Sequence, residues 1–317
     1  MKGATCRGYA AHRMTQPDRR IKDPAKLRTV TAATARRELE DLSAAIGAYH
    51  KEYTLDAVPH VTLPEKAERR DRWLTRSEVA RLLWACLGWN WDAKTNSLRR
   101  THRERAQTRA RRRHLARFIL IGIYSGTRHS PIVQARWIES LEAPYVDVAR
   151  GVLYRRGARE RKTNKRQPPV RIVPRLLAHM RRWERLDLAR TNADGQKAPA
   201  THVVHFLGRP IAGTIRTAWV KACQDAGLGP EVVPHIMRHS AATWLMHGAA
   251  PIGEAAGYLG MSEQTLRTHY QHHHPDYQDG MDQAFERARE RTGNRPKIAQ
   301  ETHETRRTKR GETKGQG

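Results

Sequence analysis

Four short segments of this sequence carry side chains that could together act on a phosphodiester bond. In-line displacement at phosphorus builds negative charge on the non-bridging oxygens, and without a metal ion arginines must neutralise it. A lysine or a histidine must also move protons to and from the reacting oxygens. The segments that offer these groups are Gly122–Arg128, Arg161–Arg166, Pro234–His239 and Tyr258–Tyr270.

None of the four segments is decisive by itself. Arg128 follows a glycine that ends an apolar run, a position also typical of an ordinary surface arginine. His235 and Arg238 stand three residues apart and so share one helix face, but this spacing is common by chance. A tyrosine such as Tyr270, inside a helical pattern, is more often a packing residue than a nucleophile. The basic turn at 161–166 is equally typical of a solvated loop.

The charge of the chain points to a polyanionic partner. The 317 residues include 59 Lys and Arg against 32 Asp and Glu, a formal net charge of +27. Such an excess favours a phosphate backbone as the partner. Positive charge is concentrated in Arg99–Arg117 and Arg150–Arg175, and we expect the first run and the basic turn at 161–166 to line a channel for such a backbone. Apolar residues make up 38% of the chain, enough for a folded core,.

Elements that could position these side chains follow from hydrophobic spacing and stop signals. A Thr75–Glu78 capping box predicts the start of a helix, and Gly126, Gly248 and Gly260 are predicted helix stops,. Tyr145–Val148, Val152–Tyr154 and Val170–Val173 are predicted strands, the first two forming a hairpin. Helices are predicted over Thr31–Tyr53, Leu115–Tyr124, Pro174–Arg190, Ile211–Ala226, His235–His247, Ile252–Leu259 and Ser262–Tyr270,.

Taken together, the motifs resemble those of the tyrosine recombinases, also called phage-type integrases. Ser125-Gly126-Thr127-Arg128 is similar to the family's T-G-x-R, and the segment from His235 to His239 is similar to its H-x-x-R-H. Leu259-Gly260-Met261 stands where the family has L-G-H, and Tyr270 follows at the usual spacing of the nucleophile. The resemblance covers about Trp73 to Tyr277 and is specific as a set.

The resemblance implies a role for each matching residue. Tyr270 would attack the scissile phosphate and form a 3′-phosphotyrosyl bond, and Arg128 and Arg238 would bind the phosphate oxygens. His235 would assist proton transfer. A hairpin lysine would protonate the leaving 5′-oxygen; Lys162 is the first choice and Lys165 the alternative. Because the covalent intermediate conserves the phosphodiester bond energy, neither ATP nor a metal ion is expected as a cofactor.

The resemblance also implies a fold and a domain order. The expected fold class is mainly α with a small antiparallel β-sheet. We expect a short helical N-terminal region at 1–62, similar to part of the family's core-binding domain. A linker at 63–72, a catalytic domain at 73–280, and a C-terminal helix with a basic tail at 281–317 would follow.

The expected partner is double-stranded DNA, bound by a homotetramer, with no membrane and no small-molecule substrate. The three cysteines, Cys6, Cys86 and Cys223, form no paired framework and suit a reducing cytosol,. An apolar N-terminal targeting segment is missing from the sequence. The protein is therefore expected in the cytoplasm, associated with DNA, and encoded by a bacterium or a phage.

Two departures from the family pattern keep an alternative open. Met261 replaces the usual histidine or tryptophan, and a thioether cannot donate a hydrogen bond to a phosphate oxygen. The N-terminal region is short for a core-binding domain. A catalytically impaired, DNA-binding accessory protein is therefore the alternative. A weaker one is a metal-dependent nuclease that uses dispersed acids, namely Asp225, Glu231 and Asp276.

Overall fold

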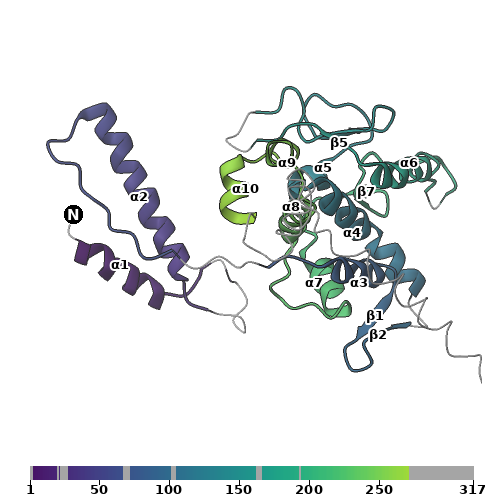
Figure 1. The fold of residues 1–317 in the computed structure, drawn as a ribbon, viewed down its shortest axis with the longest axis horizontal. Helices are drawn as coiled ribbons and strands as arrows, with labels where there is room; N and C mark the ends of the chain where they lie inside the picture. The colour runs from purple at the N-terminus through teal and green to yellow at the C-terminus, as the bar shows by residue number, and fades with distance from the viewer. Residues whose placement is uncertain are drawn as a thin grey trace, which may run out of the picture. The chain divides into compact units, whose positions relative to one another are not determined.

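The computed structural model describes residues 3–19, 21, 28–66, 72–100, 105–161, 166–192 and 194–270. The chain divides into two compact units, Met1–Asp71 and Arg72–Gly317, which are described separately (Figure 1). The predicted C-terminal part, 281–317, lies outside the described residues, and the predicted domain bounds stay predictions.

The first unit consists of two helices, α1 (Gly3–Thr15) and α2 (Ala32–Tyr53), that pack against each other. The side chain of Thr31 caps α2 by accepting a hydrogen bond from the amide of Thr34, which confirms the predicted helix start. Cys6, Leu39 and Val61 form the small core of this unit. The guanidinium of Arg13 on α1 binds Glu38 on α2 and joins the two helices.

The described part of the second unit is mainly helical with antiparallel sheets, as expected, but has three small sheets where one was expected. Thr75 and Glu78 form the predicted capping box at the start of α3. In chain order the helices are α3 (Arg76–Cys86), α4 (Arg105–Ser125), α5 (His129–Gln134), α6 (Pro174–Leu188), α7 (Arg216–Asp225), α8 (Ile236–His247), α9 (Ile252–Leu259) and α10 (Glu263–Tyr270).

Helix α4 is the centre of the second unit, and α3, α5, α6, α7 and α8 all pack against it (Figure 1). Its C-terminal half contributes the fully buried Leu115, Phe118 and Ile119 to the main core. This packing holds the last turn of α4 firmly, because every side of that half of the helix is covered. The C-terminal end of α4 is therefore a rigid place from which to present a functional turn.

The sheets connect these helices. Strands β3 (Tyr145–Asp147), β4 (Val152–Tyr154) and β5 (Val170–Arg171) form one sheet, in which Val146 pairs with Leu153 and Leu153 with Val170. This confirms the predicted hairpin and a shortened third strand. The two other sheets are β1 (Trp89–Asp92) with β2 (Ser97–Arg100), and β6 (His205–Phe206) with β7 (Arg209–Pro210).

Several features differ from the expectation. Helix α4 begins at Arg105 rather than Leu115, because its first half is rich in arginine and alanine, which favour helix without an apolar stripe,. Helix α7 begins at Arg216 rather than Ile211, and the β1–β2 and β6–β7 hairpins and α5 were not predicted. Arg117 does not line a DNA channel: it is buried and binds both carboxylate oxygens of Asp187.

The described part of the chain includes no helix with the length and apolar character needed to cross a bilayer.

Candidate active site

The turn after α4 presents Arg128. Gly126 has a φ of +60°, and a Cβ there would lie 2.2 Å from Leu259 Cδ2, so only glycine fits this turn,. The Thr127 and Ser125 hydroxyls lie 2.7 Å apart and brace the turn from inside. Arg128 then takes the position before α5, half-buried, and its Nη1 donates to the carbonyl of Arg166 at 2.8 Å. Its partial burial lowers the pKa of the guanidinium.

Arg238 reaches the same turn from α8. Its side chain is buried, and Nη1 donates to the Gly126 carbonyl at 2.7 Å. Its Nη2 lies 3.4 Å from the carbonyl of Gly260, at the end of α9. Burial, with repulsion from Arg128 and Arg155, lowers the pKa of Arg238 to about 10, and the Tyr270 phenol acts in the opposite direction. Two of the predicted phosphate-binding residues therefore meet at one turn.

Tyr270 ends α10 and lies within electrostatic reach of Arg238. Its hydroxyl forms a 2.8 Å hydrogen bond with Nδ1 of His239. The ring of His239 in turn meets the ring of His235 edge to face, with centroids 4.9 Å apart. His235 is exposed and immediately precedes the first residue of α8. The predicted histidine and the predicted nucleophile are thus linked through a third residue, His239.

The two candidate lysines, Lys162 and Lys165, lie outside the described residues. The residue that follows them, Arg166, is described, and its carbonyl accepts the hydrogen bond from Arg128. One end of the lysine-bearing loop is therefore anchored at the turn that holds Arg128.

Two residues of this site carried no assigned role in the sequence. His239 was part of the H-x-x-R-H pattern, and only its contact with Tyr270 shows what it does. Arg155, just after β4, is buried and donates to the Ser125 carbonyl at 2.6 Å and to Thr127 Oγ1 at 3.0 Å. In the sequence it is one of many arginines between 150 and 175, so no local signal marked it.

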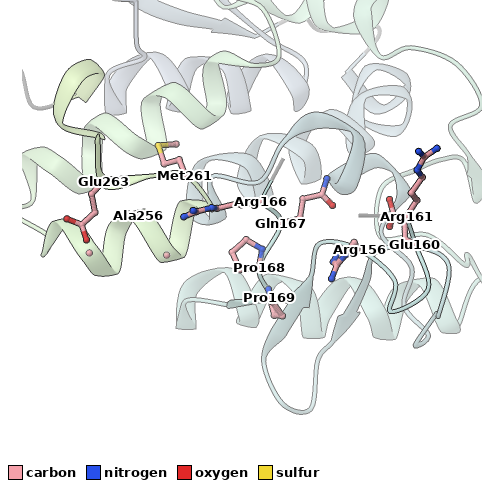
Figure 2. A pocket seen from close by; sticks show the side chains of 13 residues that line it. Arg156, Glu160, Arg161, Arg166, Gln167, Pro168, Pro169, Ala256, Met261 and Glu263 are labelled. Carbon is pink, nitrogen blue, oxygen red and sulfur yellow. The ribbon is translucent and has the colours of Figure 1, made fainter. Parts of the chain in front are cut away.

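Met261 follows α9 and packs, partly buried, against the same apolar cluster as Tyr270 and Tyr258. Its thioether fills space in this cluster and adds no hydrogen-bond donor,. A cavity of about 640 Å³ opens beside it, between the loop before β5 and helices α9 and α10 (Figure 2). Three arginines, Arg156, Arg161 and Arg166, line the loop side of this cavity together with Glu160, and Glu263 lines the side of α10.

The acids of the nuclease alternative are not gathered in this way. Asp225 lies 2.7 Å from Arg112, Glu231 lies 3.7 Å from Arg72, and Asp276 falls outside the described residues. Each of the two described carboxylates thus faces a guanidinium. The described ranges also include no group of three or more His, Cys, Asp or Glu residues placed to hold a metal ion.

Comparison with known proteins identifies the family. A family model described as Phage integrase family matches residues 73–277, well over half of the chain. The chain belongs to the phage integrase family. The matched residues include the turn, both buried arginines and Tyr270, so the site described above lies within the family domain.

Individual relatives are more distant. An 89-residue stretch is 36% identical to tyrosine recombinase XerC of Bifidobacterium longum (strain DJO10A), covering 27% of this chain and 24% of the relative. The chain thus spans about a quarter of the length of the curated relatives it matches.

Two solved structures share the fold at lower identity. The Tn1549 transposon integrase in complex with transposon right end DNA matches with a TM-score of 0.60 and 13% identity, over 90% of this chain and 86% of that one. The same integrase with circular intermediate DNA gives a TM-score of 0.58 and 14% identity, over 89% and 85%. At this level of identity the likeness establishes the integrase fold.

Proposed function

We propose that this phage integrase family member is a site-specific DNA recombinase that cuts and rejoins DNA through a 3′-phosphotyrosyl intermediate. The observation that carries the proposal is the meeting of Arg128 and Arg238 at one turn, with Tyr270 within electrostatic reach of Arg238, although the three come from distant segments. Two guanidinium groups beside a phenol are what phosphoryl transfer to tyrosine needs: charge neutralisation and a nucleophile.

In this mechanism the Tyr270 oxygen attacks phosphorus in line and the bond to the 5′-oxygen breaks. Arg128 and Arg238 bind the non-bridging oxygens and offset the charge that builds on them. Lys162, with Lys165 as the alternative, donates a proton to the leaving 5′-oxygen, which departs as a hydroxyl. Rejoining is the reverse: a 5′-hydroxyl attacks the phosphotyrosine and Tyr270 regains its proton.

The phenolic proton has a defined path out. Tyr270 bonds to His239 Nδ1 at rest, and His235 lies edge-on to the same ring. His239 therefore orients the nucleophile, and His235, which contacts the ring of His239, stands next to it as a second imidazole,. We assign the proton transfer to His235, as the family pattern implies, and the orientation of Tyr270 to His239.

The reaction conserves the phosphodiester bond in a protein–DNA link, so it needs neither ATP nor a metal ion. The proposed substrate is double-stranded DNA, in keeping with the formal net charge of +27, with the three arginines that line the cavity beside the turn and with the DNA bound in the Tn1549 integrase structures. Two duplexes exchanging strands require four nucleophiles, so we propose a homotetramer on DNA.

The test is covalent trapping on DNA nicked next to a candidate cleavage position, so that the released 5′-end diffuses away. The full chain is expected to form an adduct that resists denaturation, and Tyr270→Phe is expected to form none. Tyr154→Phe, a tyrosine on β4, is the matched control and should react normally. An adduct that survives Tyr270→Phe would refute the nucleophile. Tight DNA binding with no adduct from the unmodified chain would select the accessory-protein alternative, which Met261 favours.

A further inference from the structure

Arg155 is buried in the second unit, where a charged side chain is costly unless its surroundings compensate it,. Its Nε donates to Thr127 Oγ1 at 3.0 Å and its Nη2 to the Ser125 carbonyl at 2.6 Å. The guanidinium therefore grips the turn that presents Arg128, from the side of the β3–β4–β5 sheet.

The third nitrogen of Arg155, Nη1, is buried and has no hydrogen-bond partner. Among the described residues no ion pair connects Arg155 with a carboxylate. Burial lowers the pKa of Arg155 to about 10. The Tyr258 phenol raises that pKa, and the positive charge of Arg128 lowers it. Burying this positive charge therefore costs folding free energy, and the Nη1 donor makes no hydrogen bond with a described group.

Arg155 and Arg238 hold consecutive carbonyls of the same turn, those of Ser125 and Gly126. With Arg128 immediately after it, this short turn has three guanidinium groups around it. The three positive charges repel one another, and this repulsion offsets part of the stabilisation that their hydrogen bonds give the folded state. An anion bound at the turn would remove that repulsion.

We propose that Arg155 is a positioning residue of the phosphate site. It holds the Ser125–Arg128 turn in place and adds a third positive charge for a bound phosphate or sulfate group. This rests on the proposed function. Arg155 acts through the turn rather than by touching the DNA, because its Nη1 is out of contact with solvent. The cluster is then complete, and reaches its greatest stability, when a tetrahedral oxyanion is bound.

A purely structural reading competes with this one. Arg155 could serve only to end α4 in the correct turn, and any substitution would then weaken folding and activity alike. The two readings differ in their response to charge on the ligand. A positioning and charge-supplying role makes the effect of Arg155 depend on the ligand's negative charge, whereas a structural role does not.

The first experiment measures anion binding without DNA. Thermal unfolding is followed with sodium sulfate and with sodium chloride at equal ionic strength, for the unmodified chain, Arg155→Met and Arg159→Met. Arg159 is exposed on the same loop and is the matched control for net charge. Sulfate is expected to raise the Tm of the unmodified chain and of Arg159→Met, and Arg155→Met should lose at least half of that shift. An undiminished shift in Arg155→Met would overturn the proposal.

The second experiment compares two nicked DNA substrates, one with an ordinary scissile phosphodiester and one with a neutral methylphosphonate there. On the phosphodiester, Arg155→Met is expected to slow adduct formation by about 100-fold, as for loss of one charge-stabilising group. On the methylphosphonate the loss should shrink to about tenfold or less, because less charge needs neutralising. Equal losses on both substrates would show a structural role and overturn the proposal.

Two safeguards keep the outcomes separable. If Arg155→Met fails to fold, Arg155→Lys decides the question: it keeps the charge and should keep most of the sulfate shift, while adduct formation falls because the fork to Ser125 and Thr127 is lost. Unchanged adduct formation by the folded lysine variant would overturn the proposal. If the unmodified chain forms no adduct on any DNA, the recombinase function fails, and the sulfate experiment still tests Arg155.

Discussion

Two buried arginine environments in the second unit are opposites. Arg117 on α4 binds both oxygens of Asp187, at 2.6 and 2.8 Å, and the same carboxylate accepts from Trp137 and contacts His205. Arg238 on α8, beside the turn that follows α4, bonds among the described residues only to uncharged carbonyls and faces other arginines. One positive charge is compensated inside the fold, and the other is left for a ligand.

The difference distinguishes a structural cation from a functional one. Burial alone would raise the pKa of Asp187, but hydrogen bonds from Arg117 and His205 outweigh it and lower that pKa. The charge of Arg117 is thus balanced without any partner molecule, although its buried Nε makes no hydrogen bond with a described group. At the turn, no such carboxylate is found among the described residues, and the pKa of Arg238 and of Arg155 falls to about 10. A buried cation without an acid is a useful mark of an anion site.

The largest effect is expected from breaking the compensated pair. Asp187→Ala leaves Arg117 buried with an unpaired charge and should lower the free energy of unfolding by about 3–5 kcal/mol. Urea denaturation measures it, with the exposed Asp194→Ala as the control, expected within about 0.5 kcal/mol of the parent. A double variant, Arg117→Met with Asp187→Leu, should be less destabilised than Asp187→Ala. The opposite order would contradict the ion-pair account.

The next effect is expected at the uncompensated site and concerns chemistry rather than stability. Arg238→Gln should slow adduct formation on nicked DNA by about 10²–10³-fold, since one charge-stabilising donor is lost. The free energy of unfolding should change by less than about 1.5 kcal/mol, because only hydrogen bonds to neutral carbonyls are lost and repulsion is relieved. If Arg238→Gln destabilised the protein as much as Asp187→Ala does, the two environments would not differ as described.

The smallest effect is expected at a buried side chain that, unlike the two arginines, stays neutral in the fold. His114 on α4 is buried, and burial lowers its pKa from 6.5 to about 4. Between those pH values the unfolded chain binds a proton that the folded chain does not, so stability falls as the pH is lowered, by at most about 1.4 kcal/mol per pH unit. Urea midpoints of His114→Leu from pH 7 to pH 4 should fall less steeply than those of the parent. Parallel curves would mean that the folded chain binds a proton at His114 as readily as the unfolded chain does.

The sequence predicted the elements that depend on neighbours in the chain. The Thr75 capping box, the start of α2 at Thr31 and the β3–β4 hairpin all involve hydrogen bonds between residues close in sequence, and all are confirmed. The fold class followed from the resemblance to the family. Helix α4 was predicted too short, because its first half has no apolar stripe and is held by propensity and by contacts with α3 and α7.

The structure describes most of the predicted site residues, so their contacts can be compared with the prediction. The resemblance to the family motifs selected Arg128, Arg238 and Tyr270. The fold brings the two arginines to one turn and Tyr270 within electrostatic reach of Arg238, while Lys162 remains a prediction outside the described residues. Their catalytic roles remain proposals.

By itself the sequence determined a basic, mainly helical chain with family motifs in the right order. It could not distinguish Arg117 from Arg155, because both are arginines in basic runs. Only the tertiary structure decided that one meets Asp187, 70 residues away, while the other meets the turn after α4. The physical reason is that helix formation depends on near neighbours, whereas the compensation of a buried charge depends on which distant group the fold brings within hydrogen-bond distance.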